Sequence, residues 1–243
     1  MINDGIKNIY FLFTTGRTGT ALLSQCFGLE RWEKKAYRVN GHCVVAHEPW
    51  LDIPVDKMKL IDIYSKEAFD MAKLYLEDKL SEVKEAFPNA DSLFITDHKI
   101  GRYFGPYIAV SDLSFKAIYL ERDYADVSYS FDKKRLIKKE ELDAARYKRY
   151  LQRMWSHNKY HPNDFSIINK VSELAWSKYS FEDKFLWYAE ETALQWADLK
   201  STLSQENFLE IRLDRVYTKR DLDNISEFLN LGYDENLFSL RAN

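Results

Sequence analysis

A short run of glycine, threonine and arginine near the amino terminus is the part of the chain best suited to hold an anion. The run covers Thr15–Thr20 and contains Gly16, Arg17 and Gly19. Glycines permit a tight turn and a close approach of the backbone to a ligand. Threonine hydroxyls can donate hydrogen bonds, and the planar guanidinium group of arginine fits phosphate or sulfate oxygens. This pattern indicates a site for a phosphate or sulfate group, although an ordinary surface turn is the alternative.

The segments on either side of this run predict a strand and a helix. Residues 9–12 are apolar and predict a buried strand, and residues 21–27 predict a helix. The first N–H groups of a helix have no partner inside it, so they would point at whatever the turn holds. A Walker A motif requires lysine after its second glycine, whereas Thr20 follows Gly19 here. The turn is therefore suited to anion binding but poorly suited to magnesium-dependent phosphoryl transfer.

A second strand-like segment, residues 116–121, also ends in a cation, Arg122. Asp123 is a suitable N-cap for the helix expected after it, and Asp126 would lie in the first turn, where the helix dipole favours an acid. Ser130 follows Arg122 by eight residues, on the second turn of that helix. The side chains of Arg122 and Ser130 could therefore reach one further anionic group.

Together these two motifs resemble those of the sulfotransferases, which use 3′-phosphoadenosine-5′-phosphosulfate (PAPS). Residues 15–20 are similar to the family's 5′-phosphosulfate loop and residues 120–130 to its 3′-phosphate motif, although Tyr124 stands where the family usually has proline. Residues 207–214 and 225–231 resemble the family's late strand and closing helix. The glycine-rich, basic tail loop of the cytosolic members is missing, so the match is closer to bacterial and carbohydrate-type members.

The resemblance implies an in-line transfer of the sulfuryl group from PAPS, as co-substrate, to a hydroxyl group of a small molecule or carbohydrate. Arg17 would contact the leaving 5′-phosphate, and Arg122 and Ser130 would hold the 3′-phosphate. Further donors for the phosphosulfate would be Thr18, Gly19, Thr20 and Ala21. No metal is required, because arginine, backbone N–H groups and a helix N-terminus can stabilise the charge.

Each of two segments that follow predicted strands contains a residue that could take the proton from the hydroxyl group that is to be sulfated. Glu48 lies in residues 47–50, which resemble the Glu-Pro segment of carbohydrate-type sulfotransferases, where the glutamate is the proposed base. His98 lies in residues 96–99, which resemble less closely the Thr-His segment of cytosolic sulfotransferases. Lys99 could instead stabilise the bridging oxygen of the donor. The resemblance favours Glu48, with His98 as the rival base.

Strands and helices alternate along most of the chain. Besides residues 9–12, strands are expected at 44–46, 92–96, 116–121 and 208–213, and long helices at 65–87 and 182–203. Strands separated by helices imply parallel pairing, and such sheets bind ligands beyond the carboxyl ends of their strands. The candidates that follow predicted strand ends are Arg17, Glu48, Asp97, His98 and Arg122. We predict an α/β, three-layer, P-loop-like fold with a mostly parallel central sheet flanked by helices.

The aromatic-rich stretch 136–183 interrupts this alternation and predicts a helical insertion, either packed on the sheet or forming a lid over the acceptor. Residues 1–243 are expected to form a single α/β domain of the sulfotransferase type. The two cysteines, Cys26 and Cys43, are expected to be buried thiols rather than a disulfide framework.

Composition excludes several classes of function. The net charge of −3 argues against a non-specific nucleic-acid binder. No apolar run approaches the length of a membrane span, and the first residues lack the basic region of a signal peptide, so a cytoplasmic location is expected.

Two other functions fit the same scaffold. A nucleotide or small-molecule kinase is disfavoured by the missing lysine after Gly19 and by the Arg122–Ser130 pair. A non-catalytic nucleotide-binding protein is the second alternative, for which Tyr124 and the missing tail loop leave room.

Overall fold

The computed structural model describes residues 5–16, 18–29, 36–50, 53–156, 164, 167–214 and 217–235. The strands are β1 (Asn8–Thr14), β2 (Ala36–Asn40), β3 (Cys43–His47), β4 (Ser92–Ile95), β5 (Ser114–Arg122) and β6 (Phe208–Leu213). The helices are α1 (Thr20–Cys26), α2 (Val55–Met58), α3 (Lys66–Ala86), α4 (His98–Val110), α5 (Tyr124–Glu141), α6 (Ala144–Ser156), α7 (Glu173–Lys178), α8 (Phe181–Lys200) and α9 (Lys219–Leu229), and a 3₁₀ turn covers Gln205–Asn207.

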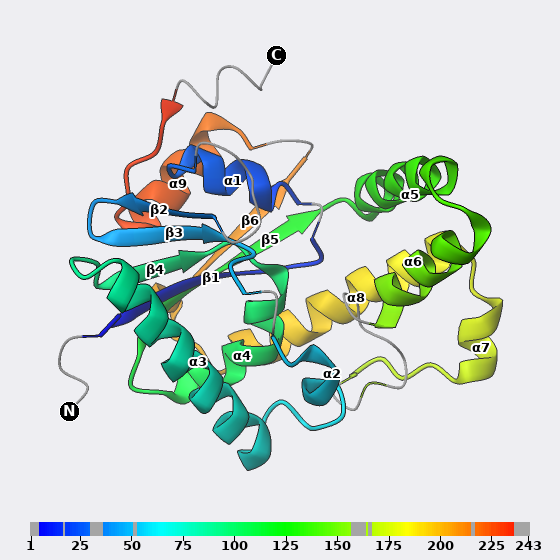
Figure 1. Ribbon diagram of the computed structural model, residues 1–243, viewed down its shortest axis with the longest axis horizontal. Coiled ribbons are helices and arrows are strands. Elements are labelled where there is room, and N and C mark those ends of the chain that lie inside the picture. Colours follow the sequence, from blue (N-terminus) through cyan, green and yellow to red (C-terminus); the bar gives the residue numbers. More distant parts are fainter. Residues whose placement is uncertain are drawn as a thin grey trace.

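The strands form one six-stranded sheet in the order β2-β3-β4-β1-β5-β6. Only the β2–β3 pair within this sheet is antiparallel, and the other neighbours are parallel. Helices cover both faces of the sheet, with α1 and α9 on one side and α3, α4 and α8 on the other (Figure 1). The prediction of an α/β fold with a mostly parallel sheet flanked by helices is confirmed.

The central strand β1 shows why the sheet is covered on both faces. Its residues are buried without interruption from Ile9 to Thr14, as expected for a parallel strand between two layers of helices. Successive side chains enter different cores: Phe11 and Phe13 pack in the core on the side of α3, α4 and α8, whereas Tyr10 and Leu12 pack in the core on the side of α1 and α9.

Several local predictions agree with the structure. Helix α3 begins after Ser65, whose hydroxyl accepts a hydrogen bond from the Ala68 N–H group. Asp123 caps α5 in the same way, with Oδ1 accepting from the Ala125 N–H group at 2.8 Å. Cys26 and Cys43 are both buried free thiols. No helix of the described residues has the length and apolar character that a bilayer span requires.

The sequence analysis did not predict the edge strand β2, the short helix α2, the 3₁₀ turn at Gln205–Asn207 or the helix α4. Helix α4 contains Gly101, Gly105 and Pro106, which disfavour a helix in sequence-based reasoning. In the structure Gly101 permits α4 to lie directly against β1, because a Cβ atom at that position would be only 2.4 Å from the carbonyl oxygen of Leu12. This close packing brings the start of α4 to the carboxyl end of β1.

The aromatic stretch 136–183 begins inside α5 and continues through α6 and α7, away from the sheet in Figure 1. Part of it is anchored to α8 by Glu191. The buried Glu191 carboxylate accepts hydrogen bonds from the N–H groups of Ile168 and Asn169 and from the side chain of Gln195. A role of this stretch as a lid stays a prediction.

Candidate functional site

The carboxyl ends of the parallel strands meet at one edge of the sheet. Thr14, the last residue of β1, pairs with Leu120 of β5, so the turn after β1 lies beside the end of β5 at Arg122. On the other side of β1, Ala46 of β3 pairs with Ile95 of β4, so the segments that follow these two strands are also neighbours. Ligands of open parallel sheets bind at this edge.

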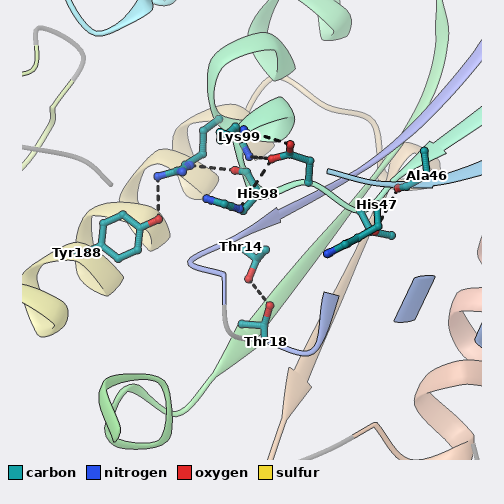
Figure 2. Close-up of polar contacts among 10 residues, drawn as sticks. Thr14, Thr18, Ala46, His47, His98, Lys99 and Tyr188 are labelled. Carbon is teal, nitrogen blue, oxygen red and sulfur yellow. Dashed lines mark hydrogen bonds and ion pairs between the residues drawn. The ribbon is translucent and has the colours of Figure 1, made fainter. Parts of the chain in front are cut away.

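The turn between β1 and α1 has the backbone that its glycines permit. Gly16 and Gly19 have φ angles of 76° and 79°, in the left-handed region. The hydroxyl groups of Thr14 and Thr18 lie 2.7 Å apart and share a hydrogen bond across the turn (Figure 2). Tyr217 covers the turn from the segment before α9: its hydroxyl donates to the Thr18 carbonyl, and its ring leaves no room for a Cβ atom on Gly19.

Helix α1 starts directly after this turn, with Gly19 as its N-cap and no side-chain cap. Thr20 and Ala21 form its first turn and are half-buried, so their N–H groups lie where an anion in the turn would be bound. Arg17 lies outside the described residues, and its contact with a leaving phosphate stays a prediction.

Arg122 and Ser130 line one pocket of about 460 Å³ at the start of α5. The other residues of its wall are Asp126, Tyr129, Lys133, Lys134 and Ile137. Lys133 and Lys134 add two cations to that of Arg122, and Nη2 of Arg122 lies 3.4 Å from Oδ2 of the acidic residue, Asp126. The pocket thus offers an arginine, a serine hydroxyl and two lysines to an anionic group, and Asp126 keeps the guanidinium group in place.

The start of α4 brings Asp97, His98 and Lys99 to the same edge. Asp97 is fully buried and caps α4, with Oδ1 accepting a hydrogen bond of 2.7 Å from the Lys99 N–H group. Burial raises the pKa of Asp97, and the negative charge of Glu48 raises it further, whereas the charges of Lys99 and Arg102 and the Lys99 N–H group lower it. The structure therefore places His98 3.8 Å from a buried carboxyl group that also interacts electrostatically with Glu48.

Glu48 follows β3 in an unusual backbone conformation. Its φ angle is 40°, in a region that residues other than glycine seldom adopt, and it precedes Pro49. Such strain is frequent at functional sites, where the surrounding structure holds it. The preceding residue, His47, is fixed by a 2.9 Å hydrogen bond between its Nδ1 atom and the Thr96 hydroxyl, which links the ends of β3 and β4.

The structure contains buried charged side chains that the sequence did not indicate, and one of them, Arg102, contacts His98. Arg102 is 1% exposed, and it donates hydrogen bonds from Nε to the His98 carbonyl and from Nη1 to the Tyr188 hydroxyl of α8. Lys59 and Asp164 form a second buried pair at 3.6 Å. Burial lowers the pKa of Lys59, and Asp164 counteracts this effect. The four-residue spacing of His98 and Arg102 is a signal for the first contact, but no local pattern connects Lys59 with Asp164.

No protein-family model matches the sequence, and no curated protein matches it. Among solved structures, a sulfotransferase domain from the curacin biosynthetic pathway is similar to this chain, with a TM-score of 0.47 and 13% sequence identity. The alignment covers 94% of this chain and 75% of that domain.

Proposed function

We propose that this protein transfers the sulfuryl group of PAPS to a hydroxyl group of a small-molecule or carbohydrate acceptor. The observation that carries the proposal is the shared pocket of Arg122 and Ser130, at the strand edge that also holds the glycine turn. Two separate anion sites at one edge of a sheet suit a nucleoside that carries phosphate groups on both the 3′ and the 5′ oxygen of its ribose.

In this proposal each of the two sites binds a different group of the donor. The turn at residues 15–20 and the first N–H groups of α1 bind the 5′-phosphosulfate, together with Arg17. Arg122 and Ser130 bind the 3′-phosphate, and Lys133 and Lys134 add positive charge to the same pocket. ATP has no 3′-phosphate, so the α5 pocket would favour PAPS over ATP.

The chemistry at the strand edge is an in-line displacement. The acceptor O–H bond breaks and its proton moves to a base, for which His98 and Glu48 are the candidates. The hydroxyl oxygen forms a bond to sulfur while the bond from sulfur to the bridging oxygen breaks. The electron pair of that bond leaves on 3′-phosphoadenosine 5′-phosphate (PAP), whose charge the glycine turn and Arg17 stabilise. Lys99, whose Nζ atom lies 3.6 Å from Oδ2 of Asp97, is the candidate for stabilising the bridging oxygen of the donor.

The binding of PAP tests the proposal without knowledge of the acceptor. At a concentration of PAP about 100 times its Kd, we expect the melting temperature to rise by about 5–10 °C, and ATP with magnesium to give a much smaller shift. Arg122→Ala should weaken PAP binding by about 10- to 100-fold, because a hydrogen bond to a charged group contributes about 1.5–3 kcal/mol.

The matched control is Arg38→Ala, which removes an exposed arginine from β2 at the opposite side of the sheet. This variant should bind PAP as the original chain does. Equal stabilisation by PAP and by ATP with magnesium, or an Arg122→Ala variant with unchanged PAP affinity, would contradict the proposal.

A further inference from the structure

The buried carboxyl group of Asp97 faces two side chains of the candidate site at once. Oδ1 of Asp97 lies 3.8 Å from Nδ1 of His98, and Oδ2 lies 3.6 Å from Nζ of Lys99. Oδ2 is buried and has no hydrogen-bond partner within the described part of the chain. The fully buried carboxyl group of Asp97 thus accepts the capping hydrogen bond and lies next to the imidazole ring of His98 and the ammonium group of Lys99, both of which are partly exposed to solvent.

Capping of a helix does not explain this arrangement. Asp123 caps α5 with nearly the same bond, 2.8 Å from Oδ1 to a backbone N–H group, but its side chain is exposed to water. At the start of α4 the aspartate is completely buried, which costs free energy that a serine or asparagine cap would avoid. The additional function of Asp97 must therefore involve its charge.

We infer that Asp97 is a positioning residue for His98, holding the imidazole ring and stabilising its protonated form when the ring accepts a proton. The inference rests on the proposed function. When the acceptor O–H bond breaks and an N–H bond forms on His98, the ring becomes a cation 3.8 Å from the Asp97 carboxylate. An opposite charge at this distance favours the charged ring. The proton later leaves the ring to solvent as the free base is restored.

The charged groups around Asp97 come from two elements. Glu48 follows β3, and its negative charge raises the pKa of Asp97. Lys99 and Arg102 belong to α4, and Arg102 is held in turn by Tyr188 of α8. Because Lys99 and Arg102 both favour the ionised form of Asp97, they help to keep a carboxylate next to His98.

The variant Asp97→Asn removes the negative charge but keeps the helix cap, because the asparagine side-chain oxygen can still accept a hydrogen bond from the Lys99 N–H group. We expect the pKa of His98 to fall by about one unit or more in this variant. The pKa is measured by an NMR titration of the imidazole signals without donor or acceptor, and His98→Gln identifies the signal. In activity assays the acid limb of the pH profile should move to lower pH by the same amount.

Asp123→Asn is the matched control, since it makes the same change at an exposed cap and should leave the pKa of His98 as it is. Asp97→Ser keeps a capping oxygen without charge and replaces Asp97→Asn if that variant does not fold. An unchanged His98 pKa in either folded variant would overturn the inference and leave Asp97 a cap only. Failure of PAP to bind would instead overturn the proposed function, since the titration uses no nucleotide.

Discussion

Replacing His98 by glutamine is expected to lower the rate of PAP formation from PAPS by about 10²- to 10⁴-fold, the usual contribution of a general base. His98 stands at the first position of α4 beside the Asp97 carboxylate, which stabilises the ring as it takes up a proton. The rate is measured at saturating PAPS with phenol as a probe acceptor, because its hydroxyl group keeps its proton at neutral pH. The affinity for PAP should not change, because the pocket that binds the 3′-phosphate is formed by α5.

Two further variants make this experiment specific. His42→Gln changes an exposed histidine in the turn between β2 and β3 and should leave the rate unaffected. Glu48→Gln removes the rival base. A large loss of rate in Glu48→Gln together with a normal rate in His98→Gln would assign the proton transfer to Glu48 and contradict the role given to His98.

Replacing Gly101 by alanine is expected to lower the free energy of unfolding by about 1–3 kcal/mol, the usual cost of overpacking, or more. The added methyl group would meet the Leu12 carbonyl oxygen at 2.4 Å, and backbone atoms cannot give way as a flexible side chain can. Helix α4 would have to move away from β1, which would also displace the start of α4 from the candidate site. Urea denaturation measures the loss.

Gly105→Ala is the matched control within the same helix. Its Cβ atom would meet the flexible tip of the Leu199 side chain at 3.1 Å and the Phe11 ring at an ordinary contact distance of 3.6 Å, and alanine gains about 1 kcal/mol in helix propensity over glycine. We therefore expect Gly105→Ala to be nearly neutral. Equal stability of the two variants would show that α4 does not depend on the close approach at Gly101.

The sequence was most informative where local chemistry determines the structure. Short segments rich in apolar residues marked most strands of the sheet, and Ser65 and Asp123 marked helix starts because capping requires a side-chain oxygen next to a free N–H group. The eight-residue spacing of Arg122 and Ser130 led to one pocket because a strand end and the second turn of the following helix face the same space.

The sequence was least informative where long-range packing determines the structure. Helix α4 contains two glycines and a proline, and its stability comes from contacts with β1 and α8 rather than from propensity. The buried partners Lys59 and Asp164 are far apart in the chain, so no spacing connects them. The site around Asp97 depends on α4, and its full set of residues became evident only in the structure.

The most direct test of the account is a crystal structure of the protein with PAP bound. We expect the 3′-phosphate within hydrogen-bond distance of Arg122 and Ser130, and the 5′-phosphate in the turn at residues 15–20. A nucleotide whose 3′-phosphate lies away from the α5 pocket, or whose 5′-phosphate lies outside the glycine turn, would contradict the claim that these two sites together bind one sulfuryl donor.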